Sequence, residues 1–252
     1  MNLDRIIAVR NDKTVYRNLD RCLKIFEAGY SKSDVLSEAL NNARAEEAGL
    51  RVPKLLEVTM FEGKWVIISE YIAGKTLSRL MLDAPAKRPE YLTLLARVQH
   101  EIHSAQVPRL VGLEDRLRRR LGLADIPDSL RQELLARLDA LSSSGYPRVL
   151  CHCDCMPSNV IISDGGEPYI IDWPHASVGD PAADAALTAM RFIAAGDEEN
   201  AREYAALFCE QSGVPATRVA LWQPIVAAAL IAEANEERRR LLRAYMKSHP
   251  LR

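Results

Sequence analysis

The sequence predicts an α+β protein with two lobes, a small antiparallel sheet carrying one helix and a larger, mainly helical lobe. Short strand-like runs fill the first 72 residues, and a single helix-forming segment interrupts them. From Thr76 onward, apolar residues recur at helical spacing. We therefore expect the first lobe in residues 1–72 and the second in residues 73–252.

The first lobe is expected to contain five strands and one helix. Two short strands fall within Arg5–Arg17 around a polar turn. The other strands are expected at Arg21–Phe26, Lys54–Met60 and Trp65–Tyr71. The helix is predicted over Ser31–Gly49, with Ser33 as its N-cap and Gly49 as its C-terminal stop.

The second lobe is expected to be built from helices, because its apolar residues repeat every three or four positions. The predicted helices span Glu90–Ser104, Leu113–Leu121, Ser129–Ser142, Pro181–Ala195, Glu198–Gln211 and Ala216–Met246. Asp180 precedes a proline at the first helical position, which makes it a good N-cap. Asp184 lies one turn further along and can serve structure or function.

Composition excludes several classes of protein. The 252 residues are 48% apolar and 27% charged, as is usual for a globular protein. The formal net charge of -1 argues against a nucleic-acid-binding protein. No apolar run approaches the length of a membrane span, and the N-terminus has no apolar signal-peptide core. We therefore expect a cytoplasmic protein with no membrane partner.

The most informative segment holds His152, Asp154 and Asn159, followed downstream by Asp172. It has the form H-x-D-x-x-x-x-N, lies between apolar runs and is followed by an aspartate at the end of another apolar run. This order is used by kinase-type phosphotransferases, in which an aspartate accepts the proton of a hydroxyl. Asp154 is the candidate for that role, and Asn159 and Asp172 are candidate ligands of Mg²⁺, which prefers oxygen. A chance match is the alternative, but the flanking runs argue against it.

This segment resembles the aminoglycoside phosphotransferase and choline kinase-like family. The family loop usually reads H-G-D-x-H-x-x-N, and its metal strand usually ends in I-D-W or I-D-F, as Ile171-Asp172-Trp173 does here. The segment Gly179-Asp180-Pro181-Ala182-Ala183-Asp184 is similar to the family's G-D-P-x-x-D. Cys153 and Cys155 replace the usual glycine and second histidine. The resemblance implies a protein-kinase-like fold and ATP-dependent transfer of phosphate.

A lysine paired with a glutamate is the next predicted part of the nucleotide site. Lys24 sits in an apolar strand, where an ammonium needs an anionic partner, and kinase folds pair such a lysine with a helix glutamate. The resemblance implies Glu38 as the partner, because it precedes Pro53 by 15 residues on the predicted helix, with Glu46 and Glu47 as alternatives. A solvated lysine on an edge strand is the alternative interpretation.

The segment Ser69–Leu77 resembles the hinge between kinase lobes. The resemblance implies that Glu70 and Ile72 bind the adenine ring through their backbone groups. The chain has no glycine between Met1 and Gly29, so a glycine-rich phosphate-binding turn is missing. The nucleotide contacts around Asn11–Thr14 are therefore not assigned to particular residues.

Five cysteines are present, and three of them, Cys151, Cys153 and Cys155, alternate along the motif. A disulfide framework and a zinc site are both disfavoured, because the compartment and the C-x-C spacing do not suit them. Cys151 is expected to be a small buried hydrophobe. Cys153 and Cys155 are expected to line the loop, where they would be open to oxidation or alkylation.

The predicted function is a magnesium- and ATP-dependent phosphotransferase that moves the γ-phosphate to a hydroxyl group of a small molecule. The acceptor is an aminoglycoside-like compound or a metabolic alcohol, and GTP remains possible as the donor. Glu233, Glu236 and Glu237 are candidates for binding a cationic acceptor, but solvated pairs such as Glu236 with Arg240 are the favoured interpretation. A catalytically silent nucleotide-binding module and a serine/threonine protein kinase are the alternatives.

Overall fold

The computed structural model describes residues 5–10, 12–107 and 110–249. The chain divides into two compact units. The first contains the residues up to Asp83 together with Pro157–His175, and the second contains Ala84–Met156 and the residues from Ala176 onward. The lobe boundary expected after residue 72 stays a prediction.

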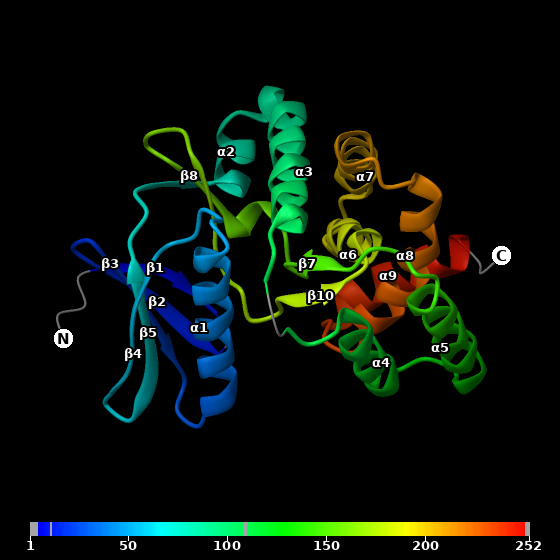
Figure 1. The fold of residues 1–252 in the computed structure, drawn as a ribbon, viewed down its shortest axis with the longest axis horizontal. Helices are drawn as coiled ribbons and strands as arrows, with labels where there is room; N and C mark the ends of the chain where they lie inside the picture. Colours follow the sequence, from blue (N-terminus) through cyan, green and yellow to red (C-terminus); the bar gives the residue numbers. More distant parts are fainter. Residues whose placement is uncertain (1–4, 11, 108–109, 250–252) are drawn as a thin grey trace. The chain divides into compact units, whose positions relative to one another are not determined.

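A five-stranded antiparallel sheet forms most of the first unit (Figure 1). Its spatial order is β1-β2-β3-β5-β4, so β3 lies at the centre. The strands are β1 (Arg5–Val9), β2 (Lys13–Asn18), β3 (Arg21–Phe26), β4 (Leu55–Phe61) and β5 (Lys64–Glu70). All five predicted strands are therefore present within two residues of their expected bounds.

The helix α1 (Lys32–Glu47) covers one face of this sheet. Phe26 and Ile67 of the sheet pack against Val35 and Ala39 of the helix. The N-cap is Ser31 and not the predicted Ser33, because the Ser31 side chain accepts the backbone N–H of Asp34. Both serines fit the sequence pattern, and only the backbone geometry distinguishes them.

Strand β6 and the returning segment Pro157–His175 of the first unit form a small three-stranded sheet in the order β6-β8-β9. The strands are β6 (Gly74–Thr76), β8 (Val160–Ser163) and β9 (Pro168–Ile170). The short helix η2 (Pro157–Asn159) precedes β8, and the helix α2 (Leu77–Asp83) follows β6. A Cβ atom at Gly74 would collide with the carbonyl oxygen of Ile162, so β6 and β8 approach this closely only because position 74 is glycine. The sheet fixes the segment that ends at Asp172.

The second unit is mainly helical, as predicted. It contains η1 (Pro85–Lys87), α3 (Arg88–Ser104), α4 (Leu113–Leu123), α5 (Asp128–Ser142), α6 (Pro181–Ala194), α7 (Glu198–Ser212), α8 (Ala216–Ile231) and α9 (Glu236–Ser248). Nearly every residue of α6 is buried, since α7, α8 and α9 all pack against it. The α+β fold class predicted from the sequence is confirmed.

The single helix predicted over Ala216–Met246 is wrong, because the chain breaks between α8 and α9. Asn235 caps α9, and its side chain accepts the backbone N–H of Arg238. An asparagine competes with helix hydrogen bonds when it lies inside a helix and favours a cap position. Among the residues that the structure describes, no helix has both the length and the apolar character needed to cross a bilayer.

Candidate active site

Lys24 lies on the central strand, where β3 pairs with β2 on one side and with β5 on the other. The alternative of an edge-strand lysine is therefore wrong. Because side chains alternate along a strand, Lys24 points to the same face as Phe26, which packs on α1. Its ammonium forms an ion pair with Glu38 of that helix. The alternative partner Glu46 instead accepts the backbone N–H of Leu55.

Asn159 and Asp172 are brought together by the hairpin of β8 and β9. Val160 pairs with Ile170, and the N–H of Ile171 donates to the carbonyl oxygen of Asn159 at 2.9 Å. The two candidate metal ligands therefore flank the open end of one hairpin. Asp172 has a φ of 68°, a left-handed conformation that aspartate tolerates better than most residues.

A second connection joins this hairpin to α1. The side-chain amide of Asn41 donates to the carbonyl oxygen of Trp173 at 3.1 Å, and Asn41 is buried. Trp173 is also buried, and its indole N–H donates to the carbonyl oxygen of Ile170. The residues on both sides of Asp172 are thereby held, which restricts where its carboxylate can lie.

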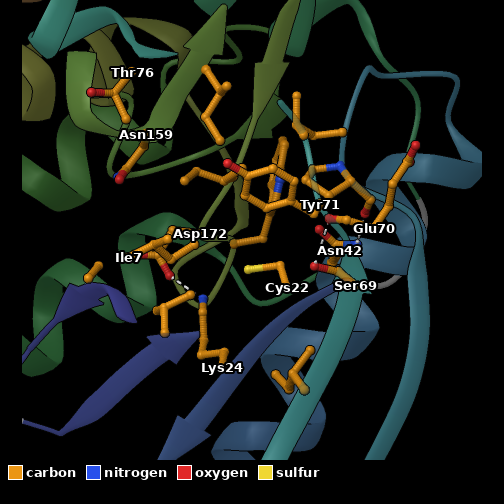
Figure 2. Close-up of a pocket in the computed structure, with 18 of the residues that line it drawn as sticks. Ile7, Cys22, Lys24, Asn42, Ser69, Glu70, Tyr71, Thr76, Asn159 and Asp172 are labelled. Atoms are coloured by element: carbon orange, nitrogen blue, oxygen red, sulfur yellow. Dashed lines mark hydrogen bonds and ion pairs between the residues drawn. The ribbon is translucent and has the colours of Figure 1, made fainter. Parts of the chain in front are cut away.

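Two lysines share one oxygen of Asp172. The Nζ of Lys24 lies 2.8 Å from Oδ1 of Asp172 (Figure 2), and the Nζ of Lys13 lies 3.1 Å from the same atom. Lys13 is also 4.0 Å from Oε2 of Glu38. Two ammonium groups and two carboxylates therefore form a compact network inside the first unit.

The network shifts the pKa values of Lys24 and Asp172. Burial by itself would lower the pKa of Lys24, but the negative charges of Glu38 and Asp172 outweigh it, and the pKa is raised above its ordinary value. Burial would raise the pKa of Asp172, but the positive charges of Lys24 and Lys13 outweigh it, and the pKa is lowered. Lys24 and Asp172 are therefore both charged at neutral pH.

These residues line a pocket of about 520 Å³, a volume in the range of small-molecule sites. Its wall includes Lys13, Lys24, Glu38, Glu70, Tyr71, Ile72, Asn159 and Asp172. Figure 2 labels five of these residues, Lys24, Glu70, Tyr71, Asn159 and Asp172. In the segment predicted to be the hinge, the N–H of Glu70 donates to the carbonyl oxygen of Lys54, and the N–H of Tyr71 donates to that of Asp20. In the part of the chain that the structure describes, the N–H of Ile72 has no such backbone partner.

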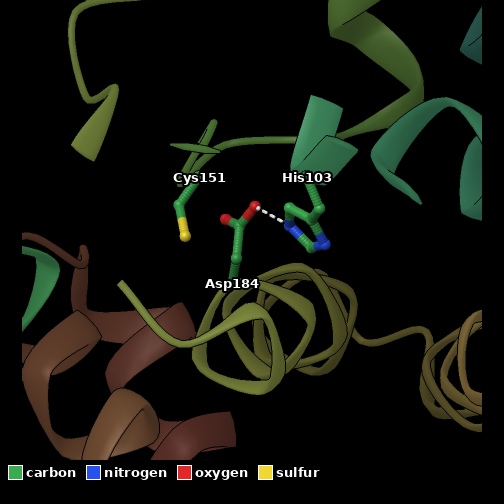
Figure 3. Close-up of side chains that lie close together, drawn as sticks. All are labelled: His103, Cys151 and Asp184. Atoms are coloured by element: carbon green, nitrogen blue, oxygen red, sulfur yellow. Dashed lines mark hydrogen bonds and ion pairs between the residues drawn. The ribbon is translucent and has the colours of Figure 1, made fainter. Parts of the chain in front are cut away.

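The H-x-D turn belongs to the second unit, where α6 holds it. It follows β7 (Val149–Cys151), which pairs with β10 (Ser177–Gly179). The buried carboxylate of Asp184 accepts the backbone N–H groups of His152 at 3.1 Å and of Cys153 at 2.7 Å. It also bonds the Nε2 of His103 at 2.9 Å (Figure 3). The sequence allowed a structural or a functional role for Asp184, and these hydrogen bonds support the structural one, which is to hold the turn in place.

Asp154, the candidate base, is paired with an arginine from α6. The Nε of Arg191 lies 2.9 Å from Oδ1 of Asp154, and its Nη2 donates to the carbonyl oxygen of Cys153 at 3.3 Å. Both side chains are about a quarter exposed, at 24% for Asp154 and 22% for Arg191. The carboxylate is therefore oriented by a neighbour and still reachable.

Asp180 is the N-cap of α6, as predicted, and accepts the N–H of Ala182 at 2.8 Å. Its other oxygen accepts from Arg218 at 2.7 Å and from the indole of Trp222 at 2.8 Å. Asp180 therefore joins the start of α6 to α8 and has a structural role.

The three cysteines of the motif are all buried, and burial raises the pKa of each thiol. Buried, protonated thiols react poorly, so the structure does not support the expectation that Cys153 and Cys155 are open to oxidation. Cys151 lies near His103 and Asp184, with the potential ligand atoms within 4.8 Å of one another (Figure 3). Zinc would need a thiolate and a free carboxylate, but Asp184 is already hydrogen-bonded. We interpret this cluster as a brace.

The carboxylates considered for a cationic acceptor are partly occupied by arginines. Glu233 lies 2.7 Å from the Nε of Arg120. Glu236 pairs with Arg239 at 2.8 Å, so the expected partner Arg240 is wrong by one residue. Glu237 is exposed in the first turn of α9.

The structure thus brings together most of the site residues named from the sequence. Lys24, Glu38, Glu70, Ile72, Asn159 and Asp172 all line the pocket of the first unit, and Asp154 lies in the second unit. Sequence reasoning missed Asn41 and Arg191, and it did not single out Lys13 within the unassigned segment Asn11–Thr14. A polar residue within an otherwise apolar helix was a usable signal for Arg191, which follows the run Ala185–Met190. Asn11, part of the unassigned turn, lies outside the described residues.

The fold and this pocket define the class of kinase-fold phosphotransferases. The chain belongs to the phosphotransferase enzyme family (APH), whose family model matches residues 5–222. The resemblance found in the sequence is therefore confirmed. Nucleotide binding is typical of this family.

Solved structures with the same fold include kinases and aminoglycoside phosphotransferases. A choline/ethanolamine kinase family protein from Mesorhizobium loti is 19% identical with a TM-score of 0.69, over 98% of this chain and 88% of that chain. A choline kinase from Streptococcus pneumoniae is 15% identical with a TM-score of 0.67, over 99% and 93%. An aminoglycoside phosphotransferase from Streptomyces rimosus is 18% identical with a TM-score of 0.61, over 88% and 91%. At these identities the likeness establishes the fold.

Proposed function

We propose that the protein is a small-molecule kinase that transfers the γ-phosphate of ATP, with Mg²⁺, to a hydroxyl group. The observation that carries the proposal is the convergence of Lys24, Glu38 and Asp172 in one pocket of nucleotide size. A lysine paired with a helix glutamate, next to an aspartate that can hold a metal, is the arrangement that kinase folds use for phosphates. ATP is the proposed donor, and GTP remains an alternative.

Each residue is assigned one task. Lys24, held by Glu38, binds phosphate oxygens. Asn159 and Asp172 supply the amide and carboxylate oxygens that suit Mg²⁺, which when bound would neutralise charge on the phosphates. Glu70 and Ile72 meet the base of the nucleotide, and the N–H of Ile72 is available for this.

Asp154 accepts the proton of the acceptor hydroxyl as its oxygen attacks the γ-phosphorus. The new O–P bond forms as the bond between the γ-phosphorus and the bridging oxygen breaks, and ADP leaves with that oxygen. Arg191 orients the Asp154 carboxylate, and Asp184 holds the turn that carries it.

For the acceptor, the charges in the second unit favour a neutral or anionic alcohol over a polycation such as an aminoglycoside. Arg191 sits directly on Asp154, and Arg116 has a buried Nε with no hydrogen-bond partner among the described residues. Arg116 is close enough to Cys153 to affect the thiol electrostatically. Two of the three carboxylates considered for a cationic ligand are paired with arginines. Positive groups near the base would repel a cationic substrate.

The two alternative functions have less support. A serine/threonine protein kinase needs a long activation loop, but α6 begins at Pro181, soon after Asp172. A silent nucleotide-binding module would not need a base, yet Asp154 is present, oriented and partly exposed.

The test is magnesium-dependent release of ADP in a coupled assay across hydroxy acids, sugars, nucleosides, homoserine, choline and aminoglycosides. Asp154→Asn serves as the blank. Turnover with one compound that the variant loses would support a small-molecule kinase and identify its acceptor. Nucleotide binding with no turnover on any compound would favour the silent module, and turnover restricted to aminoglycosides would contradict the proposed acceptor charge.

A further inference from the structure

We propose that Lys13 is a second phosphate-binding lysine, which holds the β- and γ-phosphate oxygens of the nucleotide beside Lys24. In this role its side chain replaces the backbone donors of a glycine-rich turn. The inference rests on the proposed function, because it takes the pocket of the first unit to be the site of a nucleoside triphosphate.

The register of the sheet places the two lysines on one face. Lys13 pairs with Phe26, and Val15 pairs with Lys24, in the antiparallel ladder of β2 and β3. Residues directly opposite each other in such a ladder point to the same side, and positions two apart do so as well. Lys13 and Lys24 are therefore diagonal neighbours on the face that also carries Phe26.

The ammonium of Lys13 is held inside the pocket. Its side chain is 12% exposed and lies within the lining, and its Nζ is 6.0 Å from the centroid of the Phe26 ring. The same ammonium lies 3.1 Å from Oδ1 of Asp172, which also accepts from Lys24. A lysine that merely kept an exposed surface soluble would not be placed among these groups.

Lys13 keeps donors for a ligand. An ammonium has three N–H donors. Among the described residues, the Nζ of Lys13 makes one hydrogen bond, to Asp172, whereas the Nζ of Lys24 makes two, to Glu38 and Asp172. Two donors of Lys13 therefore remain for oxygens in the pocket, and phosphate oxygens are strong acceptors of charge-assisted hydrogen bonds.

The position of Lys13 in the chain explains why such a residue is needed. It is the first residue of β2, directly after the turn from β1, and the N–H of Arg10 donates to its carbonyl oxygen at 2.9 Å. In protein kinases a glycine-rich turn covers the phosphates, and glycine lets a backbone approach a ligand closely. This chain has no glycine before Gly29. A lysine side chain reaching in from the start of β2 supplies N–H donors at the same place in the fold and adds a positive charge.

Like charges on neighbouring positions are costly unless anions compensate them. Glu38 and Asp172 compensate Lys13 and Lys24 in the network. A triphosphate adds several negative charges to the pocket, so a second ammonium stabilises it there. The effect should depend on the number of phosphates, because Lys13 lies at the Asp172 end of the pocket wall and Glu70 and Ile72 form its hinge.

The experiment measures nucleotide affinity by isothermal titration calorimetry with Mg²⁺ for the wild type and for Lys13→Met. Methionine keeps most of the length and the apolar stem beside Phe26 and removes the charge. Because a hydrogen bond to a charged group contributes about 1.5–3 kcal/mol, affinity for ATP and ADP should fall about 10- to 100-fold. Affinity for AMP, determined by competition, should change by less than about twofold. Lys13→Arg should recover part of the loss.

Lys64→Met is the matched control, since Lys64 lies in the same sheet and pairs at the surface with Glu27 at 2.8 Å. It should bind ATP like the wild type, and melting temperatures should show that all variants are folded. Lys13→Met with wild-type affinity for ATP, or with an equal loss for AMP, would overturn the role of Lys13 and leave the proposed function standing. A wild-type protein that binds no nucleotide would overturn both.

Discussion

The backbone N–H of Cys153 donates to the carboxylate of Asp184 at 2.7 Å. Cys153 has a φ of 64°, in the left-handed region, and its side chain is 1% exposed. The turn that leads into Asp154 is thus held by a buried carboxylate while carrying a residue with an unfavourable backbone conformation. The usual residue of the family motif at this position is glycine, which adopts such a φ without strain.

Cys153→Gly is therefore expected to be at least as stable as Cys153→Ala. Alanine keeps the strain at φ 64° and loses the buried thiol, whereas glycine loses the thiol and relieves about 1 kcal/mol of strain. This order of stability is the reverse of that inside a regular helix or strand, where a glycine variant is usually less stable than an alanine variant. Urea unfolding of both variants measures the difference. An alanine variant more stable than the glycine variant by 1 kcal/mol or more would contradict the argument.

Asp184→Asn should destabilise the protein by about 2–4 kcal/mol, because the amide turns a donor toward groups that themselves donate. It should also reduce turnover, since the turn that carries Asp154 loses its brace. Asp139→Asn is the control. Asp139 is exposed and pairs with Arg118 at the surface, so its loss should change stability by less than about 1 kcal/mol. Equal unfolding midpoints for the two variants would argue against the brace.

The stabilising contribution of the Asp184 carboxylate should be lost in acid. Burial would raise the pKa of Asp184, but the hydrogen bond and charge of His103 and the charge of His152 lower it below its ordinary value of 3.8. A group whose pKa is lowered by folding stabilises the protein at every pH above the pKa of that group in the unfolded chain. This contribution is lost as the pH falls through the pKa of the group in the folded protein. The stability difference between wild type and Asp184→Asn should therefore be constant above about pH 5 and shrink below about pH 4. A difference that grows in acid would contradict this assignment.

Asp172→Asn should weaken binding of Mg²⁺-ATP at least 10-fold while leaving the fold intact. Asparagine tolerates the φ of 68° that Asp172 adopts, so the backbone is not disturbed. It removes the negative charge proposed to hold the metal and leaves the amide oxygen. Calorimetric titration with ATP in the presence and absence of Mg²⁺ separates the effect on metal binding from any effect on the nucleotide alone. An affinity for Mg²⁺-ATP equal to that of the wild type would exclude Asp172 as a metal ligand.

Asp154→Asn should retain wild-type nucleotide affinity and lose most phosphotransfer, by about 10²- to 10⁴-fold. The side chain keeps its size, and the pocket of the first unit proposed to bind the nucleotide does not include it. Calorimetry and a steady-state assay with the acceptor identified by the substrate panel measure the two properties. Undiminished turnover would mean that another group accepts the proton.

The sequence alone determined the residues whose relations are local along the chain. Asp154 and Asn159 were found because they share one loop, and Asp172 was found because it ends the next strand. Lys24 and Glu38 were predicted as a pair from the family resemblance, which places the glutamate at this position of the following helix, and the structure shows their ion pair. Alternating and helical periodicities depend on neighbours within a few residues, so they are visible without a structure.

Only the tertiary structure decided the partners that depend on register and packing. Lys13 joins Lys24 because β2 and β3 pair with Lys13 opposite Phe26, and a shift by one residue would turn it to the other face. Arg191 reaches Asp154, and Asp184 holds Cys153, because α6 packs beneath the turn. The choice of Ser31 over Ser33 and the break before α9 also depended on hydrogen bonds that several sequence patterns allow equally. Contacts between distant segments form only when the whole chain is packed, so the spacing of residues along the chain does not specify them.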